Sequence, residues 1–394
     1  MSSEISGSAC EVFIDPSKHM VRKRVYYANQ GIENGHDKLW YEIEYLLRMN
    51  DENKFFPKVL NHYYKNGFLN LELEYLYEGE SLADLILDEK VSQDYIEKSL
   101  MFILNHLFGE FYIKQNTPPN PAYWQECYLE RTRRRISISL ELIVSRFPKW
   151  KILKDCIENG IEINGISYAS INKYISHLQN DQKIMERLKI NGTFCSHHDL
   201  IPENILIRRG HNRVSEFKII DPRGDRETGK GNRHFIYDMG KMMFGLDCYG
   251  LFRRGYHLGE FHDFDFSQIS DRTFLLSFNS RSVSVKHLIM AQNIFLREFR
   301  KMYENSAESG SDGRLQLLFS FACMYIPDIP CRMIDEENEK LALIFYARGC
   351  MVMHKLFLYI YGEDCFSSDY SGEQFDMWPM KAEDEWRKED GRNQ

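Results

Sequence analysis

The sequence lacks the patterns that mark a disulfide-rich, zinc-binding, membrane-spanning or secreted protein. Its nine cysteines include no pair separated by two residues, and their number is odd. A disulfide scaffold or a zinc knuckle is therefore not expected, and buried reduced thiols are the simplest interpretation. No apolar run reaches the roughly 18 residues that a membrane span needs. The opening segment MSSEISGSACEVF has neither a basic region nor a long apolar region, so we expect no signal peptide and a cytoplasmic protein.

An excess of basic residues is also lacking. The 50 Lys and Arg against 58 Asp and Glu give a formal net charge of -8, which argues against a general nucleic-acid-binding protein. The chain has 394 residues, of which 43% are hydrophobic, enough for two domains or for one two-lobed domain with a large core. We find no internal repeat and no Pro- or Gly-rich linker between independent domains.

Strand-like patterns are concentrated in the first 80 residues. Alternating or continuous apolar segments that predict strands lie at 11–14, 19–27 and 68–77. Apolar spacing over 36–50 predicts a helix between them, and helical spacing prevails from residue 78 onward, apart from short strands within 194–221. We therefore predict an α+β fold of two lobes. A small antiparallel-sheet lobe would cover residues 1–77 and a large, mainly helical lobe residues 78–394.

A polar run stands between two apolar segments at residues 195–207, CSHHDLIPENILI. Asp199 and Asn204 are five residues apart, and Asp221 ends the apolar segment FKIID seventeen residues later. The pattern H-x-D-x-x-x-x-N, then a strand, then Asp, is that of a kinase catalytic loop, here over 195–225. Asp199 would accept the proton of an attacking hydroxyl. Asn204 and Asp221 offer hard oxygen ligands for Mg²⁺, so we expect ATP and Mg²⁺ as cofactors.

Two histidines precede the candidate base. His197 is expected to serve the catalytic loop by hydrogen-bonding backbone groups and orienting the loop rather than by moving protons. His198 is either a substrate contact or a solvated loop residue. A metal site made of both is not expected, because adjacent side chains point apart and no other His or Cys has ligand spacing. Ser196 lacks the G-x-S-x-G context of a hydrolase nucleophile.

Candidates for nucleotide binding lie near the N-terminus. Gly7 and Ser8, in the segment ISGSACEVF, form a degenerate version of a phosphate-covering loop. In the predicted strand VRKRV at residues 21–25, Lys23 is our choice for the cation that grips the phosphates, with Arg22 as its competitor.

The predicted helix and the segment after the last strand add further candidates. Glu42 shares a helix face with the apolar residues three, four and seven positions further on, so it can face the strand and pair with the cation, whereas Glu44 falls on another face. The segment LELEYLYEGESL at 71–82 is interpreted as the hinge. Backbone groups near Glu74 and Leu76 would bind adenine there.

Together, HHDLIPENILI and IIDPRGD resemble the aminoglycoside phosphotransferase and choline kinase family, the small-molecule branch of the protein-kinase-like fold. That family usually has H-G-D-L-x-x-x-N-I-L, so His198 stands where glycine is common. Asp238, in YDMGKMMF, matches the family's aspartate that braces the catalytic loop. The IDPRG variant with a Y-D-x-x-K helix is similar to kinase-like proteins of bacterial capsule and surface-polysaccharide loci. The likeness covers residues 5–245, and the missing A-P-E segment favours a small substrate over a protein.

This resemblance implies transfer of the ATP γ-phosphoryl group to a hydroxyl of a small metabolite, a sugar, polyol or amino alcohol, in surface-polysaccharide biosynthesis. Two alternatives stay open. One is a nucleotide-binding pseudokinase with a regulatory or scaffold role, and the other is an aminoglycoside-type antibiotic phosphotransferase, which would need an acidic substrate cleft. We expect a small-molecule hydroxyl substrate, no nucleic-acid partner and no membrane span. The oligomeric state is not set by the sequence.

Three charged segments have two interpretations each. The run RTRRR at 131–135 is either a solvated helix face or a clamp for an anionic group on the substrate. The acidic and aromatic segment 259–271 is either an exposed loop or a cradle for an amine-bearing substrate. Arg223 and Asp225 directly follow the candidate metal ligand Asp221, so they either contact substrate or belong to the loop alone.

Overall fold

The computed structural model describes most of the chain. The described ranges are 3–6, 10–26, 35–49, 54–76, 79–115, 117–223, 234–258, 263–304 and 312–362. Gly7 and Ser8, predicted to cover the phosphates, lie outside these ranges, as do Asp225 and the predicted lobe boundary at residue 77.

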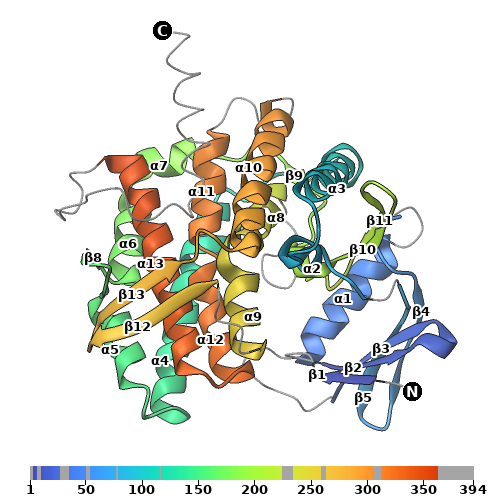
Figure 1. Ribbon diagram of the computed structural model, residues 1–394, viewed down its shortest axis with the longest axis horizontal. Coiled ribbons are helices and arrows are strands. Elements are labelled where there is room, and N and C mark those ends of the chain that lie inside the picture. The colour runs from blue at the N-terminus through green and yellow to red at the C-terminus, as the bar shows by residue number, and fades with distance from the viewer. Residues whose placement is uncertain are drawn as a thin grey trace.

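A five-stranded antiparallel sheet with one helix forms the first lobe (Figure 1). The strands, in spatial order, are β1 (Ser3–Ser6), β2 (Glu11–Asp15), β3 (Met20–Tyr26), β5 (Phe68–Glu74) and β4 (Val59–Lys65). Helix α1 (Gly35–Met49) packs on β3, β4 and β5, and it buries Leu39, Ile43 and Leu46, three residues of one helical face. The predicted helix is confirmed to within a residue or so at either end.

Strand β4 was missed by the sequence analysis. It lies at the edge of the sheet, and most of its side chains are exposed. Its sequence VLNHYYK therefore carries little of the apolar periodicity from which a strand is predicted. Only its pairing with β5 through backbone hydrogen bonds makes it a strand.

The second lobe is mainly helical, as expected. Its α-helices are α2 (Leu82–Leu87), α3 (Gln93–His106), α4 (Arg131–Ser145), α5 (Lys151–Asn159), α6 (Ile171–Asn180), α7 (Gln182–Arg187), α8 (Phe235–Phe244), α9 (Gly250–Leu258), α10 (Val283–Glu304), α11 (Gly313–Ala322), α12 (Tyr325–Asp335) and α13 (Glu339–Tyr361). Shorter turns are the 3-10 segments Pro16–Lys18 (in the first lobe) and Pro202–Asn204 and the π-helical segments Leu107–Phe111, Gln125–Glu130 and Gly245–Tyr249. Helix α13 packs on α5, α6, α9, α11 and α12 and is buried along most of its length, so it forms the centre of this lobe.

Short strands of the second lobe fall into three groups. Hairpin β10 (Ile205–Arg209) and β11 (Val214–Ile219) follows the predicted catalytic loop, as expected. Strands β6 (Lys114–Gln115) and β9 (Thr193–Phe194) form a two-residue pair just before that loop. A further four-stranded sheet was not predicted. Its order is β12 (Phe264–Ser270), β13 (Thr273–Phe278), β7 (Ile161–Ile163) and β8 (Ile166–Tyr168).

This four-stranded sheet corrects the interpretation of segment 259–271 as an acidic loop or a substrate cradle. Phe264 and Phe266 alternate inward with the more exposed residues between them, which is strand periodicity. The sheet lies at the side of the helical lobe remote from the first lobe (Figure 1). Residues 259–262 lie outside the described ranges, and of the described acidic residues Asp265 lies in β12 while Asp263 and Asp271 flank it.

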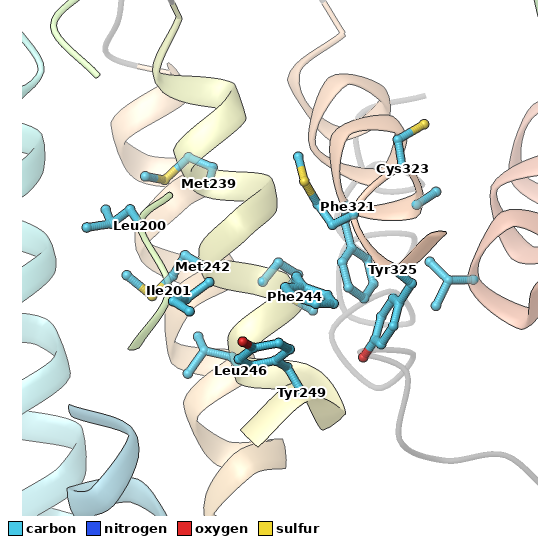
Figure 2. Close-up of a cluster of buried hydrophobic side chains, with 14 of the residues drawn as sticks. Leu200, Ile201, Met239, Met242, Phe244, Leu246, Tyr249, Phe321, Cys323 and Tyr325 are labelled. Carbon is cyan, nitrogen blue, oxygen red and sulfur yellow. The ribbon is translucent and has the colours of Figure 1, made fainter. Parts of the chain in front are cut away.

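A cluster of buried side chains joins the catalytic-loop segment to the helical core (Figure 2). Leu200 and Ile201 of that segment lie against Met239 and Met242 of α8, while Phe244 of α8 faces the α11–α12 region. Burying a Leu or Ile side chain contributes about 1.5–3 kcal/mol. Two apolar residues directly after Asp199 thus hold the polar loop against α8.

Among the described residues, two stretches of helix have the length and hydropathy of a membrane span. They are Gly313–Asp335 and Glu339–Tyr361, and 83% and 89% of their most apolar windows are buried inside the fold. Burial of this extent is typical of core helices in a globular protein. The eight cysteines in the described residues are free thiols, as expected.

Candidate active site

A carboxylate on α8 organises the catalytic loop. The backbone N–H groups of His197 and His198 both donate to the side chain of Asp238, at 2.6 Å each. Asp238 is fully buried, and this burial raises its pKa to about 7, against the opposing effect of the two N–H donors. The contact gives Asp238 the bracing position that the family resemblance implied.

His197 ties the catalytic loop to the strand that carries Asp221. Its Nδ1 accepts the backbone N–H of Asp199 at 3.2 Å, which leaves Nε2 to donate to the carbonyl of Ile220 at 2.8 Å. The ring stacks on Phe56 with an interplanar angle of 5°. Burial lowers the pKa of His197 to about 3, so the ring is neutral at neutral pH. This geometry suits an orienting residue better than a proton carrier.

His198 occupies a backbone position that favours glycine. Its φ of 65° lies in the left-handed region, which carries a steric cost of about 1–2 kcal/mol for a residue with a Cβ. The N–H contact to Asp238 and a 2.7 Å hydrogen bond between its Nε2 and Ser196 Oγ hold it there. The departure from H-G-D is therefore accommodated locally, and the His198 side chain lines the cavity beside Asp199.

Asp199, the predicted base, is held between two cations. Arg223 approaches its Oδ2 at 2.7 and 2.8 Å, and Lys241 lies 2.9 Å from its Oδ1. Arg223 also donates its backbone N–H to the carbonyl of His197 at 3.0 Å. The structure thus places the Arg223 backbone in the loop, and the Arg223 side chain lines the cavity, so a substrate contact stays a prediction.

Lys241 was not singled out from the sequence. It stands three residues after Asp238 on α8, and residues at this spacing share a helix face. The face that braces the loop therefore also delivers a cation to Asp199. The Y-D-x-x-K pattern carried this signal, because its aspartate and lysine are separated by that spacing.

Lys23 lies where the two lobes meet. Its Nζ is 2.7 Å from Glu42 Oε1 on α1 and also contacts Asp221 Oδ1, although Asp221 is 198 residues away in sequence. Lys23 and Glu42 are 8% and 6% exposed. The alternative cation Arg22 has its side chain on the opposite face of β3, where it pairs with Glu72 at 2.8 Å.

The candidate hinge residues lie at and after the end of β5. Glu74 is the last residue of that strand, and its N–H donates to the carbonyl of Lys58 at 2.9 Å. That N–H is engaged within the sheet. Leu76 follows the strand end and is half-buried, and adenine binding by this segment stays a prediction.

Asn204 and Asp221 lie together on the wall of the cavity that contains Asp199. The Asn204 carbonyl accepts the N–H of Ile220 at 2.9 Å, which sets the strand end beside the loop. The Asn204 side-chain amide donates to the Asp199 carbonyl at 2.8 Å and so leaves its oxygen as an acceptor. Asp221, with φ of 60°, is a second left-handed residue, and such strain gathers at functional sites.

These two side chains fit Mg²⁺ by their chemistry. A carboxylate and an amide oxygen are hard donors, and Mg²⁺ in nucleotide sites commonly takes only one or two protein ligands, with phosphates and water as the rest. In the described ranges, no group of three or more His, Cys, Asp or Glu forms a metal cluster. The protein would thus supply a partial ligand set.

The basic run RTRRR is divided between the cavity wall and the solvent-exposed face of α4, and its role as an anion clamp stays a prediction. Arg131 and Arg135 are 8% and 6% exposed and line the cavity, whereas Arg133 and Arg134 are exposed on the other side of α4. Residues four apart share a helix face, so the run divides into a cavity pair and a solvent pair.

Comparison with known proteins gave structural neighbours alone. No family model matches the chain, and no curated protein matches it. Among the matching solved structures, the aminoglycoside phosphotransferase APH(3'')-Id from Streptomyces rimosus ATCC10970 is 11% identical, with a TM-score of 0.44 over 84% of this chain and 92% of the other. An aminoglycoside-3'-phosphotransferase of type VIII is 14% identical, with a TM-score of 0.41 over 83% and 93%. Both scores are below one half. The two-lobed, kinase-like α+β fold therefore stands on the strand order, the α1–β3 ion pair and the braced catalytic loop.

Proposed function

We propose that this chain is an ATP-dependent kinase of a small molecule, transferring the γ-phosphoryl group to an acceptor hydroxyl. The observation that carries the proposal is the contact of the Lys23 ammonium with the Glu42 and Asp221 carboxylates, because Asp221 also lines the cavity that contains Asp199. An ammonium so placed can turn to nucleotide phosphates while Glu42 keeps it in position. The sequence resemblance to proteins of surface-polysaccharide loci extends the proposal to that biosynthetic setting.

The proposed reaction is an in-line displacement. The acceptor oxygen forms a bond to the γ-phosphorus, the bond between that phosphorus and the β,γ-bridging oxygen breaks, and ADP leaves. The hydroxyl proton passes to the carboxylate of Asp199. Asp199 is fixed in position by Arg223 and Lys241, so its part in the reaction is mainly to align the acceptor hydroxyl with the γ-phosphorus.

Mg²⁺, held by Asn204 and Asp221, would supply charge neutralisation for the phosphates. The protein's own part is alignment. Backbone hydrogen bonds around Asp199 and Ile220 fix the positions of the proposed base and the proposed metal ligands relative to one another.

The test is ADP release from Mg-ATP with a panel of sugars, polyols, amino alcohols and aminoglycosides, comparing the wild type with Asp199→Asn. We expect turnover on one acceptor class and a loss of at least about 100-fold in kcat in the variant. Turnover by Asp199→Asn equal to that of the wild type would show that Asp199 takes no part in the reaction. Protein that binds Mg-ATP tightly in a thermal-shift assay but turns over no acceptor would instead support the pseudokinase alternative.

A further inference from the structure

The cavity beside Asp199 has a volume of about 610 Å³, which is within the range of small-molecule sites. Its wall includes the catalytic loop and residues of α4, α8 and α12. Both signs of charge line this cavity, and their distribution bears on the chemistry of the acceptor.

We propose that Arg131 and Arg135 of α4 bind an anionic group, a phosphate or a carboxylate, on the acceptor whose hydroxyl meets Asp199. The inference rests on the proposed kinase function and narrows its substrate class. The two guanidinium groups are four residues apart on one face of α4 and nearly buried. Guanidinium groups match the oxygens of phosphate and carboxylate with paired N–H donors, and partial burial strengthens such contacts.

The acidic side chains of α12 already have cations of their own. Arg332 lies 2.9 Å from Asp328 and also contacts Glu336, and Arg253 of α9 lies 3.5 Å from Glu336. Arg332 is 4% exposed, so this network is itself part of the buried wall. Asp328 and Glu336 are therefore ion-paired with protein cations, while Asp328 Oδ2 accepts no hydrogen bond from the described residues.

Arg131 instead faces the catalytic-loop end of the cavity. Its guanidinium lies 5.9 Å from the ring centre of Tyr237, and that ring lies 5.5 Å from the ring of His198. Arg131 joins Arg223 and Lys241, which flank Asp199, at this end of the cavity, and the carboxyl groups of Glu203 and Asp221 also line it. A polycationic acceptor would meet like charge here, whereas an anionic acceptor would meet complementary charge.

The first experiment uses the full chain with four forms of one hexose. Neutral glucose, cationic glucosamine, the carboxylate glucuronate and the phosphate ester glucose 6-phosphate are compared by ADP release from Mg-ATP. The last two compounds separate the two possible sources of the anion. Inorganic phosphate, titrated calorimetrically into protein saturated with Mg²⁺ and a non-hydrolysable ATP analogue, probes the anion subsite independently of the carbon skeleton.

The variants take advantage of the divided arginine run. Arg131→Gln/Arg135→Gln removes the cavity pair, and Arg133→Gln/Arg134→Gln is the matched control on the exposed face of the same turns. We expect the Arg131→Gln/Arg135→Gln variant to have a KM for an anionic acceptor, and a Kd for phosphate, about 10- to 100-fold above those of the wild type. The Arg133→Gln/Arg134→Gln variant should have the wild-type values. If the buried Gln pair does not fold, Arg131→Lys/Arg135→Lys keeps the charge and should still raise both constants severalfold, because lysine lacks the paired donors.

The outcomes separate the anion site from the kinase. Phosphate binding that depends on Arg131 and Arg135, with no ADP from any acceptor, supports the anion site and counts against the kinase. Phosphorylation of neutral or cationic hexoses alone, with KM unchanged in the cavity variants, overturns the anion site and leaves the kinase. Equal phosphate affinity in the wild type and in both double variants also overturns the anion site.

Discussion

The ion pair of Arg348 with Asp247 and that of Lys23 with Glu42 differ in what surrounds them. Arg348 and Asp247 are 1% and 0% exposed and meet through two hydrogen bonds of 2.7 and 2.8 Å, and Tyr325 donates a third to Asp247. Lys23 and Glu42 meet through one contact, and Lys23 shares its charge with Asp221, whose side chain is 43% exposed. The first pair is enclosed in the helical core, whereas the second contacts the partly exposed Asp221, which lines the cavity beside Asp199.

If the proposed function holds, this difference separates a pair that only stabilises the fold from a pair that also binds phosphate. A buried pair with every donor and acceptor used cannot exchange partners without a large cost. A lysine held by one carboxylate, with a second carboxylate at the cleft, can exchange that second partner for a phosphate. Stability and activity should therefore respond to different pairs.

The largest effect on stability should come from breaking the closed pair. Arg348→Met leaves the Asp247 carboxylate buried without its counter-ion, so we expect a loss of about 3–5 kcal/mol in the free energy of unfolding. Urea unfolding measures this loss, and activity per folded molecule, assayed well below the Tm, should be unchanged. A variant of wild-type stability would show that the pair contributes nothing to the core.

Lys23→Arg should have the opposite effect, lowering activity while leaving stability nearly unchanged. The positive charge beside Glu42 is kept, so unfolding should change little, but a planar guanidinium cannot place its charge as the ammonium does between Glu42 and Asp221. We expect kcat/KM for phosphoryl transfer to fall by about 100-fold or more. Paired measurement of Tm and turnover is the check, and retained turnover would exclude Lys23 as the phosphate-binding cation.

A buried carboxyl without a full set of partners gives the next effect. In the described part of the chain, Glu203 Oε2 is buried with no hydrogen-bond partner, and burial raises the pKa of Glu203 to about 7. The folded state then holds this proton more tightly than the unfolded state, whose pKa is about 4.5. The resulting stability is present below pH 4.5 and is lost as the pH rises through 7.

Glu203→Gln should remove that dependence. Relative to the wild type, we expect the variant to gain up to about 3 kcal/mol between pH 5 and pH 8. Urea unfolding of both proteins at the two pH values gives the difference, and the raised pKa of Asp238 cancels because both proteins contain it. A constant difference across this range would mean that Glu203 titrates normally.

The smallest effect should come from the neighbour of Lys23. Arg22 pairs with Glu72 on the other face of β3, and its side chain is 37% exposed. Arg22→Met should therefore cost at most about 1 kcal/mol and leave turnover unchanged. A loss of turnover comparable to that of Lys23→Arg would contradict the assignment of the two faces.

Much of the catalytic loop could be predicted from the sequence, because its chemistry depends on residues close together in the chain. Asp199 and Asn204 are five residues apart, and the hairpin of β10 and β11 brings Asp221 back beside them. The choice of Glu42 over Glu44 rested on helical spacing, and the structure pairs Glu42 with Lys23, the cation chosen over Arg22.

The rest depended on contacts between distant segments. Nothing local in RTRRR shows that α12 packs against α4 and makes part of the cavity wall, so the burial of Arg131 and Arg135 was not predictable. The segment of strand β12 was misinterpreted because its acidic residues suggested a loop, whereas the alternation of Phe264 and Phe266 with exposed residues indicates a strand. The pairing of β13 with β7 joins segments more than 100 residues apart, beyond the reach of any local pattern.

The central claim is that the cleft between Lys23, Asp199 and Asp221 transfers phosphate from Mg-ATP. Its most direct test is ADP release with the acceptor panel by the wild type and by Asp221→Ala, with Tm measured on both. We predict turnover by the wild type that falls by at least about 100-fold in the variant while the Tm changes little, because Asp221 is partly exposed. Near wild-type turnover in Asp221→Ala would contradict the account.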